Sequence, residues 1–175
     1  MIGLHWYSGG KNNIMYEIKT IDNFLDTSLF NSIQELVLGN EIPWYMQSSI
    51  AIKDDNMGMY FTHLLHTSDT KESYLKPKFL PILDYLKPKE LIRIKLNCYP
   101  RSDNLERHPP HVDYNTPHKG CIIAMNTCNG YTEFEDGRKF ESIANRALLF
   151  DPSIKHNSTN CTDDKARINI NINYN

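Results

Sequence analysis

The stretch ARINININ, residues 166–173, alternates without interruption between apolar and polar side chains. Successive side chains of a β-strand point to opposite faces, so the isoleucines share one face and Arg167 shares the other with the asparagines. We therefore predict a strand over Lys165–Tyr174 that packs its isoleucines against a buried layer. The isoleucines are Ile168, Ile170 and Ile172, and the asparagines are Asn169, Asn171 and Asn173.

Further short strands precede this one, beginning after Pro88. Glu90–Tyr99 alternates in the same way and places Arg93, Lys95 and Asn97 on one face. The Asn129-Gly130 and Asp136-Gly137 pairs are turn signals. The other predicted strands are Lys119–Asn126, Tyr131–Glu135, Arg138–Ile143 and Arg146–Asp151.

The residues before Pro88 carry the predicted helices. Asp26 is suited to cap a helix over Thr27–Leu38 that ends at Gly39. A second helix is expected to start near Lys78, and its inward residues are Phe79, Leu80, Leu83 and Leu86. Strands are expected at Met15–Ile21 and Tyr60–Thr67, with a short extended segment at Pro43–Tyr45.

Two helices followed by many short strands favour a mainly β fold, namely a jelly roll with helices packed outside one sheet. The chain has 175 residues, a length that suits one domain. We predict a single domain over residues 1–175. Within it, residues 1–88 supply helices and bracing strands, and residues 89–175 form the core jelly roll.

Charge and cysteine content narrow the class of partner. Nineteen basic and 21 acidic residues give a net charge of −2, which argues against a nucleic acid or an acidic membrane as partner. The basic excess from Lys76 to Lys95 is interpreted as a solvated helix face and flank. No apolar run approaches the roughly 20 residues that span a bilayer, and residues 1–14 lack the apolar segment of a secretory signal. Because the four cysteines form no C-x-x-C pair, we expect reduced thiols in a cytoplasmic protein.

The residues that point to chemistry are His111 and Asp113, an H-x-D motif. In a strand, positions i and i+2 point to the same side, so this imidazole and this carboxylate can converge. His156 lies just beyond the predicted strand that ends at Asp151. Two histidines and one carboxylate on one face form the facial triad of non-haem Fe(II) sites, which leaves coordination positions open.

Arg167 adds a second feature on the C-terminal strand. If its polar face lines the interior of the barrel, the guanidinium is buried and needs an anionic partner, and it matches a ligand carboxylate in bidentate geometry. The alternative is a surface strand whose Arg and Asn side chains lie in water.

The order H-x-D, then His, then Arg resembles the Fe(II)/2-oxoglutarate-dependent dioxygenase superfamily. It is most similar to the small prolyl-hydroxylase-like oxygenases of phage and bacterial genomes. The resemblance extends over Glu90–Tyr174. It is carried by the stretches HPPHVDY (108–114), NGYTEFEDG (129–137), ALLFDPSIKHNS (147–158) and ARINI (166–170).

This resemblance implies a double-stranded β-helix, a cupin-like jelly roll, in which His111, Asp113 and His156 bind Fe(II). It also implies that Arg167 binds the distal carboxylate of 2-oxoglutarate. O2 and 2-oxoglutarate would be consumed, and succinate, CO2 and a hydroxylated product released. The substrate would be an unidentified protein side chain, such as proline, or a small molecule.

Departures from the family pattern narrow the expected reaction. Prolyl-hydroxylase-like relatives often have Lys at the position of Arg167. Alkylated-DNA-repair relatives have a second Arg where this chain has Asn173, which argues against a nucleic-acid substrate. Halogenating relatives have a small residue in place of Asp113, so hydroxylation is the favoured reaction.

Tyr99, Asn97 and Asn169 are further candidates for cosubstrate binding. Tyr99 and Asn97 lie on the strand before His111, and Asn169 shares a strand face with Arg167. Tyr99 fits a core aromatic residue equally well, and Asn169 fits a supporting group. His108 and His118 flank the H-x-D motif and are expected in solvent-exposed loops.

Two other function classes stay open. One is a cupin-like metalloenzyme that does not use 2-oxoglutarate; such sites usually contain more histidine ligands. The other is a jelly-roll binding module without catalysis, in which His111 and Asp113 only contact each other.

Overall fold

The computed structural model describes residues 18–51, 58–68 and 72–175. Its strands form two antiparallel sheets, a seven-stranded sheet of order β1-β8-β5-β10-β4-β3-β2 and a three-stranded sheet of order β7-β6-β9. The strands are β1 (Lys19–Ile21), β2 (Tyr45–Gln47), β3 (Tyr60–Thr67), β4 (Leu91–Pro100), β5 (Lys119–Ala124), β6 (Cys128–Phe134), β7 (Lys139–Ser142), β8 (Ala147–Phe150), β9 (His156–Ser158) and β10 (Ala166–Tyr174).

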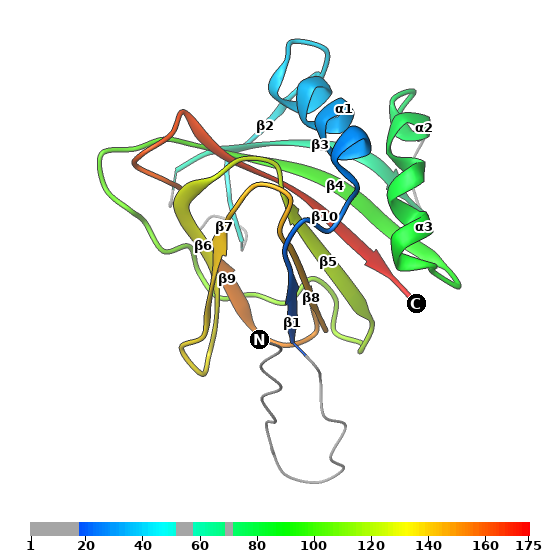
Figure 1. The fold of residues 1–175 in the computed structure, drawn as a ribbon. Helices are drawn as coiled ribbons and strands as arrows, with labels where there is room; N and C mark the ends of the chain where they lie inside the picture. The colour runs from blue at the N-terminus through cyan, green and yellow to red at the C-terminus, as the bar shows by residue number, and fades with distance from the viewer. Residues whose placement is uncertain (1–17, 52–57, 69–71) are drawn as a thin grey trace, which may run out of the picture.

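Helices cover one face of the large sheet, and the small sheet lies on the other side (Figure 1). They are α1 (Thr27–Leu38), α2 (Lys76–Phe79) and α3 (Leu83–Leu86), with a 3-10 turn over Leu80–Ile82 between the last two. Two antiparallel sheets with helices outside one of them confirm the predicted mainly β fold of the jelly-roll type.

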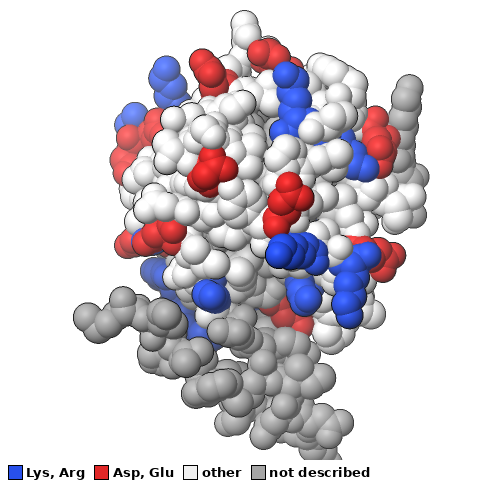
Figure 2. Space-filling view, turned by 45° about the vertical axis from the view of Figure 1, so that its right-hand side comes forward, with Lys and Arg blue, Asp and Glu red and all other residues white. Residues whose placement is uncertain are grey.

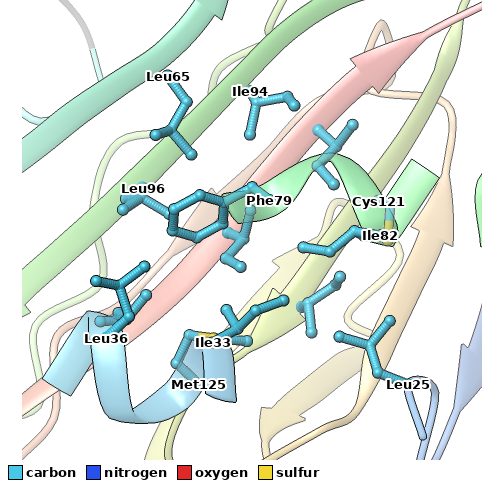
Figure 3. Close-up of a cluster of buried hydrophobic side chains, with 14 of the residues drawn as sticks. Leu25, Ile33, Leu36, Leu65, Phe79, Ile82, Ile94, Leu96, Cys121 and Met125 are labelled. Atoms are coloured by element: carbon cyan, nitrogen blue, oxygen red, sulfur yellow. The ribbon is translucent and has the colours of Figure 1, made fainter. Parts of the chain in front are cut away.

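The C-terminal strand β10 lies near the centre of the large sheet, between β5 and β4. Its three isoleucines belong to the apolar cluster under the helices, as the alternation predicts. Figure 3 shows this layer, in which Ile33 of α1 and Phe79 of α2 face Leu65, Ile94 and Leu96 from β3 and β4. The polar face of β10 is therefore turned away from the helices, toward the small sheet.

Helix α1 has the predicted bounds. Asp26 Oδ1 accepts a hydrogen bond of 3.0 Å from the backbone N–H of Leu29, which satisfies one of the unpaired donors of the first turn. The helix ends before Gly39, and its apolar stripe is buried. The buried residues of the stripe are Phe30, Ile33, Leu36 and Val37.

The second helical segment differs from the prediction. It starts at Lys76 and is interrupted by the 3-10 turn that contains Pro81. Because side chains three residues apart lie above one another in a 3-10 turn, Phe79 and Ile82 point inward and are fully buried. Leu80, which was predicted to face inward, is 39 % exposed.

The two turns predicted in the β region have different outcomes. The Asp136-Gly137 turn is confirmed, and Gly137 has a φ of 84°. The Asn129-Gly130 pair forms no turn, because both residues lie inside β6, where the pairing with β7 shifts register. Strand β9, which begins at His156, was not predicted. Residues 15–17 of the first predicted strand, and residues 1–14, lie outside the described residues.

The described surface carries charges of both signs, in line with the nearly balanced composition. Lys and Arg side chains are interspersed with Asp and Glu on the face shown in Figure 2. All four cysteines are free thiols. Within the described ranges, no helix is long and apolar enough to cross a membrane.

The pair Phe79 and Leu80 provides a test of the helical layer. Phe79→Ala should lower the free energy of unfolding by about 3–5 kcal/mol, since a fully buried aromatic side chain is removed. Leu80→Ala should lower it by less than about 1 kcal/mol, since that side chain is largely outside the core. Urea denaturation of both variants measures the difference, and equal losses would contradict this packing.

Candidate functional site

Two histidines and one aspartate converge on the inner side of the small sheet. One ligand atom from each of His111, Asp113 and His156 lies within 4.8 Å of the other two. His111 Nε2 is 3.9 Å from Asp113 Oδ1, and the two imidazole ring centres are 4.7 Å apart. The structure thus brings together the three residues that the sequence predicted as a metal-binding triad.

The local structure around these residues differs from the predicted strand. His111 forms an isolated β-bridge with His156, and Asp113 lies in a bend. Backbone hydrogen bonds run in both directions between His111 and His156, at 2.9 and 3.0 Å. The two histidines are therefore fixed by cross-chain pairing, and the convergence with Asp113 does not depend on a continuous strand.

Each histidine has one ring nitrogen occupied by the backbone. Nδ1 of His156 lies 2.9 Å from the carbonyl of Ile154, and Nδ1 of His111 lies 3.4 Å from the carbonyl of Pro109. Because a carbonyl oxygen only accepts, Nδ1 donates in both cases. The lone pair is then on Nε2, which is the state of a histidine that binds a metal.

The carboxylate of Asp113 is bound on one oxygen and free on the other. Oδ2 accepts hydrogen bonds of 3.1 Å from both Asn171 and Asn173, and it lies 2.8 Å from a guanidinium nitrogen of Arg93. Burial alone would raise the pKa of Asp113, but nearby positive charge, above all that of Arg93, holds the pKa well below its usual range. Asp113 therefore stays ionised, with Oδ1 turned toward His111.

Both histidines are neutral near pH 7. Burial lowers the pKa of His111 to about 4, with a further contribution from His156. Burial also lowers the pKa of His156. Two neutral imidazoles and one ionised carboxylate are the protonation states that a divalent metal requires.

Arg167 lies inside the barrel and not in water. Its residue is 3 % exposed, and its two terminal nitrogens donate to the backbone carbonyl of Thr159 at 3.1 Å and to Thr132 Oγ1 at 2.9 Å. Its Nε is buried without a hydrogen-bond partner, and within the described ranges no carboxylate forms an ion pair with this guanidinium. A buried charge in this state is suited to bind an anion.

The space next to Arg167 is small and shaped by glycine. A cavity of about 20 Å³ is lined in part by Arg167, Asn169 and Thr132. A Cβ atom on Gly130 would lie 2.6 Å from Cδ of Arg167 and would also meet the carbonyl oxygen of Asn160. The glycine in β6 therefore makes room for the stem of the arginine.

The other predicted cosubstrate residues lie at two levels of the sheet: Tyr99 is opposite Arg167, and the Asn97–Asn169 pair is between Arg167 and Asn171, which bonds Asp113. Tyr99 stacks on Tyr60 with ring centres 5.2 Å apart, and its ring is 5.8 Å from the guanidinium carbon of Arg167. Asn97 donates a hydrogen bond of 2.9 Å to Asn169, which leaves the buried Oδ1 of Asn97 without a partner. All three side chains are buried on the inner face of the large sheet.

The expectation that His108 and His118 lie in solvent is wrong, since both are buried. Nδ1 of His108 lies 2.8 Å from Ser158 Oγ, and Nε2 of His118 lies 2.8 Å from Asn173 Oδ1. They pack around the site because the loops that carry them fold onto β9 and β10. Neither belongs to the group of possible metal ligands found among the described residues.

Sequence reasoning also missed Arg93 and Lys95, which were assigned to a solvated flank. Both lie partly buried on the inner face of β4, opposite Asn173 and Asn171 of β10. Burial lowers the pKa of Lys95 to about 8, helped by the charge of Arg93. The alternation of Glu90–Tyr99 contained the signal, because it puts Arg93 and Lys95 on the same face as Asn97.

No family model and no curated protein matches this sequence. Solved structures do match at the level of the fold. A 2OG-Fe(II) oxygenase family oxidoreductase from Burkholderia pseudomallei aligns over 91 % of this chain and 84 % of its own, with 10 % identity and a TM-score of 0.66. A Pseudomonas putida prolyl-4-hydroxylase aligns over 90 % and 92 %, with 11 % identity and a TM-score of 0.58.

A third match is a Trichoplax adhaerens prolyl hydroxylase, solved with a peptide fragment of hypoxia inducible factor. It aligns over 90 % of this chain and 82 % of its own, with 15 % identity and a TM-score of 0.59. Identities this low establish the fold alone. The chain therefore has the double-stranded β-helix fold of the 2-oxoglutarate-Fe(II) oxygenases, which confirms at this level the resemblance seen in the sequence.

The low pKa of His111 predicts how the metal-free protein responds to acid. In the unfolded chain a histidine binds a proton as the pH falls through its ordinary value near ~6.5, whereas folded His111 does so only at about 4. The free energy of unfolding should therefore fall between pH 7 and pH 5, with about 1–2 kcal/mol due to His111. Urea denaturation in EDTA should show a shallower fall for His111→Gln, and an equal fall would contradict the assignment.

Proposed function

We propose that this protein, which has the fold of the 2-oxoglutarate-Fe(II) oxygenases, is an Fe(II)- and 2-oxoglutarate-dependent hydroxylase. It would act on a protein side chain such as proline, or on a small molecule, with release of succinate and CO2. The observation that carries the proposal is the convergence of His111, Asp113 and His156, with both Nε2 atoms and one carboxylate oxygen available.

The donor set fits Fe(II). His111 and His156 would supply two nitrogens and Asp113 one oxygen, and this combination with open coordination positions is typical of non-haem Fe(II) oxygenases. The bound iron and 2-oxoglutarate together supply the oxidising chemistry that uses O2. Since the site needs ligands that stay deprotonated, the neutral histidines and the ionised Asp113 match this use.

The remaining residues of the chain position these groups. Asn171, Asn173 and Arg93 hold Asp113 by its Oδ2, so that Oδ1 keeps a fixed direction. Arg167 would pair with the distal carboxylate of 2-oxoglutarate, and this pairing would neutralise the buried guanidinium. Tyr99 and the Asn97–Asn169 pair would form the wall of the cosubstrate pocket between these two ends.

Hydroxylation is the favoured outcome because Asp113 retains its carboxylate. Prolyl hydroxylases are among the proteins with this fold, and the Trichoplax enzyme was solved with a peptide. The fold also occurs in SnoN, a non-haem α-ketoglutarate-dependent epimerase from nogalamycin biosynthesis. A protein side chain and a small molecule are therefore both included in the proposal.

The metal site is tested by His111→Ala. Loss of one of three protein ligands should weaken Fe(II) binding by more than about a hundredfold, since changes to groups that only support a ligand already cost 10- to 100-fold. Asp113→Asn should have a similar effect. Metal titration under anaerobic conditions measures the affinity. His63→Gln is the control, because this buried histidine bonds Pro43 and Ser73 away from the site.

The cosubstrate site is tested by Arg167→Ala. Removal of one partner of a buried charge pair typically costs about 3–5 kcal/mol, so 2-oxoglutarate should bind at least about a hundredfold more weakly. Arg167→Lys should bind better than Arg167→Ala but lose the bidentate geometry. Fe(II) binding should survive in both variants. Calorimetric titration of the anaerobic iron-loaded protein measures these affinities.

Arg146 provides a matched control for that experiment. It lines the same small cavity as Arg167, but its guanidinium pairs with Asp22. Arg146→Ala should therefore leave the affinity for 2-oxoglutarate within about twofold of wild type. Equal affinity for 2-oxoglutarate in wild type and Arg167→Ala would contradict the assignment of Arg167 to the distal carboxylate. A purified protein that binds neither stoichiometric iron nor 2-oxoglutarate would instead fit a binding module.

A further inference from the structure

Lys95 is a cation inside the site that the proposed chemistry does not use. It lies on the inner face of β4, directly opposite Asn171 of β10, and Asn171 bonds the triad residue Asp113. Its Nζ is 5.9 Å from the centre of the Tyr60 ring. Among the described residues, no side chain or carbonyl accepts a hydrogen bond from Lys95 Nζ, and no carboxylate pairs with it.

The neighbouring carboxylate, that of Asp113, already forms an ion pair with Arg93. Asp113 is the acidic group whose charge acts on Lys95, and Arg93 holds its Oδ2 at 2.8 Å. Glu133 pairs with Arg107 at 2.7 Å and therefore offers no free charge either. Lys95 thus has an attractive but distant interaction with Asp113, and no carboxylate of the described residues pairs with it directly.

Binding of the metal and 2-oxoglutarate would not remove the excess positive charge in the site. A divalent metal and the two carboxylates of 2-oxoglutarate cancel in charge, and Asp113 offsets one of the three cations Arg93, Lys95 and Arg167. The distal carboxylate of 2-oxoglutarate is assigned to Arg167. Lys95 is four residues from Tyr99, the residue opposite Arg167, or about 13 Å along β4, so the two cations start from different levels of the barrel.

Aromatic rings lie next to the two cations of β4, and a ring contact leaves the charge of Lys95 available to an anion. The Arg93 guanidinium carbon is 5.3 Å from the centre of the Tyr114 ring, and Lys95 lies over Tyr60. Leu64 of β3 lies directly opposite Lys95 and is 36 % exposed, so the sheet opens to the surface at the level of Lys95. A molecule that enters there would meet Lys95 near the three proposed metal ligands.

We propose that Lys95 binds an anionic group of the substrate, so that the substrate carries a carboxylate or a phosphate close to the carbon that reacts. This inference rests on the proposed oxygenase function and specifies its substrate class. An ammonium group binds either anion as a point charge. The other source of a carboxylate at this position is the metal-binding end of 2-oxoglutarate itself, and the experiment has to separate the two.

The test uses protein loaded with Zn(II), which is diamagnetic, and saturated with 2-oxoglutarate. Acetate and inorganic phosphate are titrated separately, and backbone amide NMR signals of Leu96 and Asn171 report binding. Wild type should show a saturable shift with at least one of the two anions. Lys95→Met should weaken that binding at least tenfold. Lys95→Gln, which keeps a polar side chain, should weaken it similarly.

Lys119→Met is the matched control. Lys119 Nζ also lies 5.9 Å from the centre of a tyrosine ring, that of Tyr174, but at the exposed start of β5. This variant should bind both anions as wild type does. Equal anion binding by wild type and Lys95→Met, or no saturable shift in wild type, would overturn the inference.

A separate measurement distinguishes failure of this inference from failure of the proposed function. The affinity of each metal-loaded variant for 2-oxoglutarate should stay within about twofold of wild type, which also shows that the variants fold. A tenfold loss in Lys95→Met would mean that Lys95 serves the cosubstrate, and the substrate role would be wrong. The oxygenase proposal would then stand, because it depends on the triad and on Arg167.

Discussion

The pairing of β10 between β4 and β5 is the constraint on which both the core and the site depend. One face of this strand supplies three isoleucines to the layer under the helices, and the other supplies Arg167 and three asparagines to the barrel. Because the side-chain period of a strand is two, a shift of one residue would exchange these faces. It would place a guanidinium in the apolar core and isoleucines at the candidate metal site.

Burial of so many polar groups is tolerated because nearly every one has a partner. Asn171 and Asn173 both donate to Asp113, and Asn97 donates to Asn169. Among the buried atoms without a partner, Nε of Arg167 and Oδ1 of Asn97 lie where 2-oxoglutarate is proposed to bind. Unpaired buried polar atoms are costly in a fold, so the position of these two atoms next to the proposed cosubstrate supports a functional explanation.

Much of the fold could be predicted from the sequence, and the predictions that were wrong have physical reasons. Strands with a buried face, such as β3 and β10, and the capped helix α1 depend on local alternation and capping, and these were found. Asn129-Gly130 was misread because its glycine serves close approach to Arg167 and not a turn. His108 and His118 are buried by contacts with Ser158 and Asn173, which are far away in the chain.

The candidate metal ligands also show what sequence patterns can and cannot predict. The convergence of His111, Asp113 and His156 could be predicted because their residue types are few and their chemistry is specific. The bridge between His111 and His156, and the role of Arg93 as the partner of Asp113, could not, because both arise from tertiary pairing. Only the register of β4 against β10 places Arg93 next to Asn173 and turns a predicted surface charge into part of the site.

The position of β10 also fixes the order in which the protein can be completed. This strand follows all the other described strands along the chain, yet it separates β4 from β5 in the middle of the large sheet. During synthesis the edges of β4 and β5 that pair with β10 stay unpaired until residue 174 has left the ribosome. Unpaired strand edges are prone to wrong pairing. A chain interrupted before residue 166 would lack Arg167 and the strand at the centre of its main sheet, so neither the isoleucine layer nor the buried polar face could form.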